Sequence, residues 1–137
     1  DLVDIARIAV ADLAPLAIAA GYEISFHGDA MCVERKGDGA ALRRAIGNLI
    51  RNAIEHGGGH GAITVSALAD GEISVSDEGP GIPADHQDLV FEPFYRVVPN
   101  SRGAGLGLSL VKQIVESHGG YVSIESSSSG TRVTMRL

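Results

Sequence analysis

Two asparagines stand four residues apart in the stretch from Leu42 to Gly57. Apolar residues recur there at spacings of three and four, which predicts one buried face of an amphipathic helix. Because residues four apart lie on the same side of a helix, Asn48 and Asn52 share a second stripe beside that face. Carboxamide oxygens are neutral, hard ligands that suit Mg²⁺, an ion that usually also binds substrate phosphates. The pair is therefore a candidate for metal or phosphate binding, although surface or hydrogen-bonded core asparagines would show the same spacing.

A carboxylate followed by two glycines stands where an apolar run ends. The sequence V-S-D-E-G-P-G at 75–81 predicts a strand that runs into a tight turn. An ionised carboxylate only accepts hydrogen bonds, so Asp77 suits the exocyclic amine of adenine and disfavours guanine, whose carbonyl it would repel. Gly79 and Gly81 would let the backbone approach a base closely. By itself, however, such an aspartate is more typical of an ordinary turn.

A third glycine-containing stretch, G-A-G-L-G-L at 103–108, opens a second amphipathic helix. Successive backbone N–H groups in such a loop accept phosphate oxygens, and the dipole of the following helix favours anions. A dinucleotide-binding fingerprint is the rival interpretation. It fails because residues 99–102, which include a proline, cannot form a central buried strand and no β-α-β unit surrounds them.

These stretches follow one another as N-x-x-x-N, D-x-G-x-G, F-E-P-F at 91–94, and G-x-G-L-G-L. In this order and spacing they resemble the N, G1, F and G2 boxes of the ATP-binding catalytic domain of bacterial sensor histidine kinases. That domain belongs to the superfamily shared by gyrase, Hsp90, MutL and these kinases. The resemblance covers nearly the whole chain, and four ordered boxes are far more specific than any one of them.

The resemblance implies ATP and Mg²⁺ as cofactors, with adenine on Asp77, the metal on Asn52 and the phosphates on the glycine-rich loop. It implies no catalytic residue in this chain, because the phosphoacceptor histidine of the family lies on a separate dimerisation domain. The implied partners are that domain and, through the full-length kinase, a response regulator; the fragment itself is expected to be monomeric. The other nucleotide-binding residues that it implies are Asn48, His56, Gly79, Gly81, Ile82, Arg96, Arg102, Gly103, Gly105, Leu106, Gly107, Leu108 and Thr131.

Two positions bear on the reaction. Asn48 stands where the ATPases of the superfamily have a glutamate that activates water. An amide cannot act as a general base, so phosphoryl transfer to a group from elsewhere is favoured over hydrolysis. Glu55 stands where the family often has Lys or Arg, and its carboxylate would repel phosphates or bind metal-bound water. Arg51 could compensate for the missing positive charge, but it points roughly 100° away from Asn52 on the helix. A stand-alone ATPase and a non-catalytic, nucleotide-free interaction module therefore remain alternatives.

The remaining cations and histidines have weaker signals. The segment from Phe91 to Ala104 matches the family's nucleotide lid and is expected to be mobile. Its two arginines, at 96 and 102, either reach the phosphates or stay solvated. His56 resembles the family's residue near the ribose, but a histidine that caps helix carbonyls would look the same. His60 follows it across glycines with no third ligand evident, so a zinc site is not expected.

Composition limits the classes of protein to which this chain can belong. The chain has 137 residues and a net charge of -6, which indicates one acidic domain without the basic stripe of a nucleic-acid-binding protein. The single cysteine, Cys32, excludes an internal disulfide and indicates a small core residue. No apolar run approaches a membrane span and no signal peptide is visible. Because the chain begins mid-pattern without Met, we expect an excised fragment. We expect it to be cytoplasmic, with the cytoplasmic part of an inner-membrane sensor as one form of that location.

The hydrophobic pattern predicts the elements that must position these residues. Strands joined by hairpins, with helices between them, indicate an α+β two-layer sandwich: a mixed, mainly antiparallel sheet with helices on one face. The resemblance implies the same Bergerat-type fold. Pro15 could kink or break the first helix, and Asp38 is a suitable N-cap for the central one. The expected helices are 3–20, 42–56, 84–90 and 108–118, and the expected strands are 22–27, 31–34, 63–67, 72–75, 121–126 and 131–137.

Overall fold

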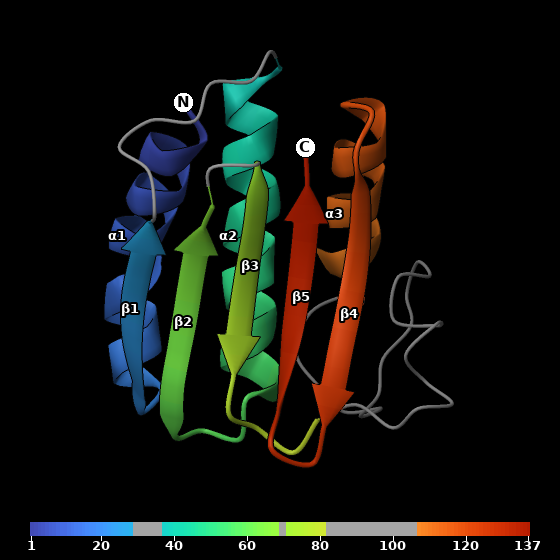
Figure 1. Cartoon of the computed structure of the whole chain (residues 1–137). Helices are drawn as coiled ribbons and strands as arrows, with labels where there is room; N and C mark the ends of the chain where they lie inside the picture. Colours follow the sequence, from blue (N-terminus) through green and yellow to red (C-terminus); the bar gives the residue numbers. More distant parts are fainter. Residues whose placement is uncertain (29–36, 69–70, 82–106) are drawn as a thin grey trace.

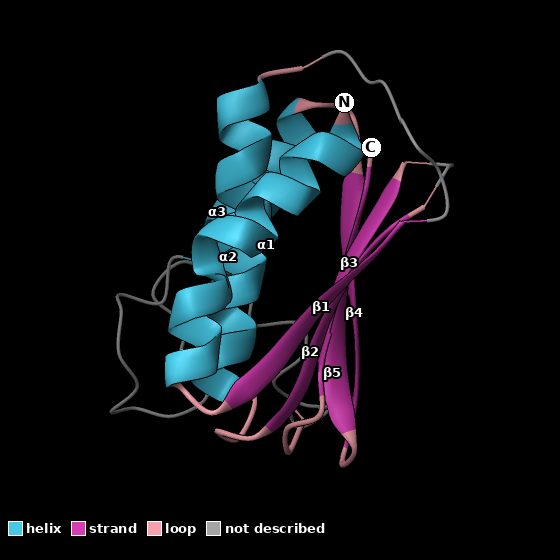
Figure 2. Cartoon of the chain, turned by 90° about the vertical axis from the view of Figure 1, so that its left-hand side faces the viewer, coloured by secondary structure: helices cyan, strands magenta, loops and turns pink. Residues whose placement is uncertain are grey.

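Five strands and three helices make up the part of the chain that the computed structural model describes, which is residues 1–28, 37–68, 71–81 and 107–137. Figure 1 shows all three helices behind the sheet, and Figure 2 shows the two layers edge on. The predicted two-layer α+β sandwich is therefore confirmed. The elements are α1 (Leu2–Ala19), β1 (Tyr22–Gly28), α2 (Gly39–His56), β2 (Gly61–Ala67), β3 (Glu72–Asp77), α3 (Gly107–Ser117), β4 (Tyr121–Ser127) and β5 (Gly130–Arg136).

The strands lie in the order β1-β2-β3-β5-β4. β1 and β2 are parallel, and α2 forms the crossover that a parallel pair needs. The other three pairings are antiparallel, as predicted for a mixed, mainly antiparallel sheet. Because β5 lies between β3 and β4, the C-terminal hairpin brings Thr131 beside Asp77.

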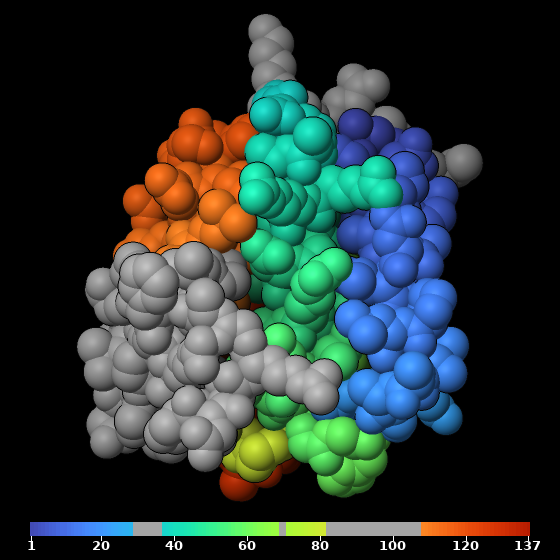
Figure 3. Space-filling view, turned by 180° about the vertical axis from the view of Figure 1, so that it is seen from behind, coloured from blue at the N-terminus to red at the C-terminus, as the bar shows by residue number. Residues whose placement is uncertain are grey.

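The core lies between the two layers. α2 is the central helix, and Figure 3 shows it flanked by α1 and α3 on the outer face of the helix layer. Its six buried residues are the ones that the sequence periodicity predicts: Leu42, Ala45, Ile46, Leu49, Ile50 and Ala53. The sheet meets them with alternate residues such as Val65 and Met135, both fully buried. Asp38 caps α2 as predicted, since its Oδ1 accepts a hydrogen bond from the backbone N–H of Ala41 at 3.2 Å.

The helix expected at 3–20 is confirmed as α1, and Pro15 does not break it. α1 continues through Pro15 to Ala19. Proline removes the hydrogen bond to the carbonyl four residues earlier, here that of Ala11. Both residues are exposed, so water can bind that carbonyl, and the buried face made by Ala6, Leu13 and Ala17 stays continuous.

Several predictions lie outside the described residues. They are the strand at 31–34 with Cys32, the short helix at 84–90, the lid, and the candidate site residues Ile82, Arg96, Arg102, Gly103, Gly105 and Leu106. Among the helices that are described, none combines the length and apolar character needed to cross a membrane.

Candidate nucleotide site

The asparagines and His56 are carried by the central helix. Asn48, Asn52 and His56 are all half-buried, and they follow one another at four-residue intervals on the flank of α2 beside its buried face. α2 ends at His56, and the next residue, Gly57, is buried. The helix therefore aligns two carboxamides with an imidazole along one line that ends at the glycines that follow α2, Gly57 to Gly59.

Asp77 is the last residue of β3, at the end of the sheet nearest the C-terminal end of α2 (Figure 1). Its Oδ1 accepts a hydrogen bond from the backbone N–H of Gly79 at 2.9 Å. Burial raises the pKa of Asp77 above its ordinary value, while hydrogen bonds from the backbone of Gly79 and Thr131 and the nearby charge of His56 partly oppose that rise. The turn after Asp77 contacts the end of the asparagine helix, because a Cβ added to Gly79 would lie 2.7 Å from the Gly57 Cα. A partly desolvated carboxylate at the sheet end can accept a hydrogen bond from a ligand's N–H group.

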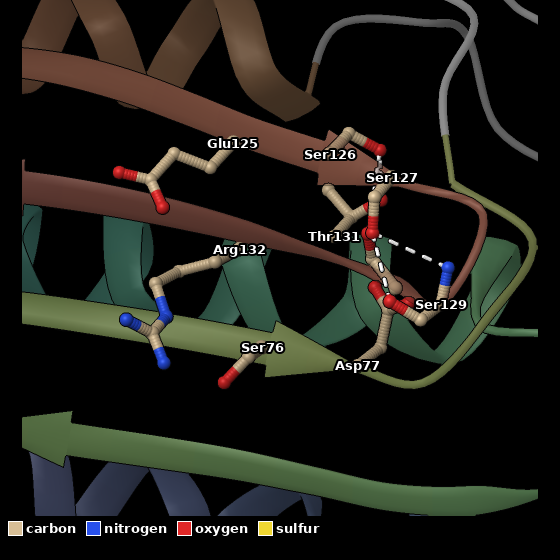
Figure 4. A pocket seen from close by; sticks show the side chains of 9 residues that line it. Ser76, Asp77, Glu125, Ser126, Ser127, Ser129, Thr131 and Arg132 are labelled. Atoms are coloured by element: carbon tan, nitrogen blue, oxygen red, sulfur yellow. Dashed lines mark hydrogen bonds between the residues drawn. The ribbon is translucent and has the colours of Figure 1, made fainter.

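The C-terminal hairpin adds two hydroxyl groups. Thr131 pairs with Asp77 in the sheet, and Ser126 pairs with Thr131 across the hairpin. The two hydroxyl oxygens lie 2.8 Å apart. Figure 4 shows the Ser126 and Thr131 side chains next to each other, with Asp77 on the strand that neighbours Thr131. Ser126 was not among the sequence candidates; the hairpin register would have identified it, because it places Ser126 opposite Thr131 on the helix-facing side of the sheet.

A hollow of about 400 Å³ lies at this end of the sheet. Its lining includes residues from both faces of the sheet: Ser76, Asp77, Glu125, Ser126, Ser127, Ser129, Gly130, Thr131 and Arg132 (Figure 4). Because side chains alternate along a strand, Asp77 and Thr131 face the helices, whereas Ser76 and Arg132 face away. No residue of α2 lines this hollow, so the candidate site rests on the helix-facing side chains of Asp77 and Thr131 and not on the hollow itself.

Other sequence candidates fall in different places. Gly81 lies against the β4–β5 turn, where a Cβ would meet the carbonyl oxygen of Ser127 at 1.9 Å. Gly107 begins α3, and Leu108 is only 7% exposed, so its side chain belongs to the core. In the described ranges, no three His, Cys, Asp or Glu side chains gather as metal ligands. Asn52, the magnesium position that the resemblance implies, lies half-buried on α2.

Two charged residues, Arg51 and Glu55, flank Asn52 on α2 and have different surroundings. Glu55 Oε2 lies 3.8 Å from Nε2 of His56, so its carboxylate has a local partner at the end of α2. Arg51 lines a separate groove of about 440 Å³ between α1 and α2, which Asn48 borders. Arg43 crosses that groove to pair with Asp12 on α1. Arg51 therefore lies on the side of α2 that faces α1.

Comparison with known proteins agrees with this architecture. Residues 37–137 match the family described as histidine kinase-, DNA gyrase B- and HSP90-like ATPases, and the chain belongs to that family. Sensor protein IrlS of Burkholderia pseudomallei is 40% identical over an alignment of 119 positions that covers 82% of this chain and 25% of that protein. The histidine-protein kinase/phosphatase MprB of Mycobacterium avium is 41% identical over 79% of this chain and 22% of its own length. The chain thus spans a quarter or less of these curated relatives.

Two solved structures of histidine kinases resemble this chain over nearly its whole length. The catalytic domain of histidine kinase ThkA superposes with a TM-score of 0.86 and 25% identity, covering 98% of this chain and 91% of that one. A mycobacterial sensor histidine kinase MprB structure gives 0.83 and 29% identity, covering 100% and 93%. The resemblance to the ATP-binding catalytic domains of sensor histidine kinases is therefore confirmed.

Proposed function

We propose that this chain binds Mg-ATP and donates the γ-phosphate to a histidine on a separate dimerisation domain, as the catalytic domain of a two-component sensor kinase. The observation that carries the proposal is the position of Asp77. Its half-buried carboxylate is held by the backbone N–H of Gly79, and Gly79 packs against Gly57, the residue that follows the asparagine helix. A ligand with an amino group at one end and phosphates at the other matches this order of groups.

Each residue would have a limited role. Asp77 would accept a hydrogen bond from the adenine amine, and the glycine-containing turn would lie along the base. Asn52 is the residue that would hold Mg²⁺, which when bound neutralises phosphate charge. Asn48 has no acid–base capacity, so the chain itself would not activate water. Phosphoryl transfer needs mainly positioning and charge neutralisation, which this set of groups can provide.

The proposed partners lie in the rest of the protein. The relatives are named as a sensor protein and a signal transduction histidine-protein kinase/phosphatase, of which the match covers 25% and 22%, and one similar structure is full-length ShkA in complex with AMPPNP. We accordingly propose a dimerisation domain as the acceptor, a response regulator as the next recipient of the phosphoryl group, and a cytoplasmic location for this domain.

Calorimetric titration with a non-hydrolysable ATP analogue, with and without Mg²⁺, tests the binding step. Saturable binding that Mg²⁺ strengthens and Asp77→Asn abolishes is the expected result. Absence of binding by the folded wild-type chain would reject the proposal in favour of a nucleotide-free interaction module, to which Glu55 would then be the clue.

Labelled ATP tests the transfer step. The chain alone should acquire no label and should release little phosphate, whereas adding a separately prepared sensor-kinase dimerisation domain should give a labelled histidine on that domain. Steady Mg²⁺-dependent release of phosphate by the chain alone would instead support a stand-alone ATPase.

A further inference from the structure

A buried tyrosine joins the end of the central helix to the loop that follows it. Tyr22 is the first residue of β1 and is 4% exposed. Its hydroxyl donates a hydrogen bond to the carbonyl of Ile54 at 2.9 Å and accepts one from the backbone N–H of Gly59 at 2.8 Å. Both capacities of this buried hydroxyl are thus used, and both partners belong to the segment around the end of α2.

The segment that Tyr22 contacts has few side chains of its own with which to order it; His60 Nδ1 lies 3.1 Å from the Gly58 carbonyl oxygen. The last turn of a helix leaves carbonyls without partners inside the helix. Gly57, Gly58 and Gly59 follow α2 without side chains, and the latter two have φ values of +86° and +80°. Three consecutive glycines have high conformational freedom in the unfolded chain, so external contacts must order them. Tyr22 supplies contacts at both ends of this glycine run.

The same glycines touch the turn that carries Asp77. A Cβ added to Gly57 would lie 2.9 Å from the Tyr22 hydroxyl, so this glycine fits directly against the tyrosine. On its other side, a Cβ added to Gly79 would lie 2.7 Å from the Gly57 Cα. Gly79 in turn donates its N–H to Asp77. A continuous series of contacts therefore runs from Tyr22 through the two glycines to the carboxylate.

We propose that Tyr22 is a positioning residue of the nucleotide site. It holds the end of α2 against the Gly79 turn, and so fixes Asp77 relative to Asn52 and His56, without itself touching a nucleotide. This inference rests on the proposed function for its effect on ATP, but the positioning of the Gly79 turn can be measured without any nucleotide.

Tyr22→Phe is the decisive variant because it keeps the buried ring and removes only the hydroxyl. Tyr121→Phe is the matched control, since Tyr121 is 58% exposed on the opposite edge strand, β4. Amide hydrogen exchange at Gly59 and Gly79 should accelerate in Tyr22→Phe and not in the control. At a temperature where circular dichroism shows both variants folded, affinity for the ATP analogue should fall roughly five- to tenfold, which corresponds to the loss of about one hydrogen bond. The preference for ATP over GTP should also fall.

The outcomes are distinguishable. Unchanged exchange at Gly79 in Tyr22→Phe would overturn the inference whether or not the chain binds ATP. Faster exchange with unchanged affinity and base preference would also overturn it, because Tyr22 would then be a packing residue only. Faster exchange in a chain whose wild type binds no ATP would reject the proposed function and leave Tyr22 as the residue that positions the Asp77 turn. If Tyr22→Phe does not fold, Gly57→Ala replaces it: the added Cβ would meet the Ala53 carbonyl oxygen as well as the Tyr22 hydroxyl, and exchange at Gly79 should again be faster.

Discussion

The backbone carbonyl of Ser127 closes over Gly81, so that a Cβ on this glycine would lie only 1.9 Å from the carbonyl oxygen. Gly81 also has a φ of +80°. The turn after Asp77 is thereby seated against the hairpin that carries Ser126 and Thr131, and two parts of the candidate site are held together by a contact that only glycine permits.

Gly81→Ala should therefore destabilise the fold more than backbone strain alone explains. Gly119 is the matched control, since it has the same φ of +80° but nothing within 4 Å of an added Cβ. We expect Gly119→Ala to lower the free energy of unfolding by about 1 kcal/mol and Gly81→Ala by a further ~1–3 kcal/mol. Urea denaturation followed by circular dichroism measures both. Equal losses would mean that the hairpin moves away from Gly81 at no cost.

Asp77→Asn should change how stability depends on pH. Because burial raises the folded-state pKa of Asp77 above its ordinary 3.8, ionisation of this group opposes folding. The protonated form of Asp77 contributes its full stabilisation below pH 3.8, and this stabilisation is lost as the pH rises through the raised pKa. Relative to Asp77→Asn, the wild type should thus become less stable between about pH 3 and neutrality, as measured by denaturation at a series of pH values.

The exposed aspartate Asp4 provides the comparison for this experiment. Its side chain is 65% exposed and pairs only with Arg7 among the ion pairs of the described chain. Asp4→Asn controls for the loss of one negative charge. A stability difference between wild type and Asp77→Asn that stayed constant with pH would contradict the predicted effect of burial.

Asn52→Ala should remove the magnesium-dependent part of ATP binding. If Asn52 holds the ion, the variant's affinity should fall roughly tenfold or more in the presence of Mg²⁺ and change little without it. Gln113→Ala removes an exposed carboxamide from α3 and should behave as wild type. Calorimetry with and without Mg²⁺ measures the difference. An equal loss under both conditions would assign Asn52 to the nucleotide or to packing rather than to the metal.

His118→Ala should loosen the junction between α3 and α2. Nε2 of His118 accepts a hydrogen bond from the N–H of Asp38 at 3.0 Å, so Nδ1, which lies 2.8 Å from the Ile114 carbonyl, must be the donor in the neutral ring. Losing both bonds should lower the free energy of unfolding by about 1–2 kcal/mol. His27→Ala, on the exposed side of β1, should have little effect in the same denaturation experiment. Similar losses for both variants would contradict the bridging role.

Local patterns were sufficient for most of the elements. The buried face of α2, the alternation of Tyr22, Ile24 and Phe26 in β1, and the cap at Asp38 all depend on neighbours within a few residues. Pro15 was the exception, because whether a proline breaks a helix depends on whether the freed carbonyl faces water, which local sequence does not reveal.

For the candidate site, spacing alone placed Asn48 and Asn52 on one side of a helix and Asp77 at the end of a strand. It could not show that Thr131 and Ser126 lie beside Asp77, or that Tyr22 reaches the loop after α2, because these contacts join residues far apart in the chain. They exist only once the strands take the order β1-β2-β3-β5-β4 and the helices pack on one face. Periodicity describes which side of an element is buried, whereas the packing of layers decides which buried and half-buried groups meet.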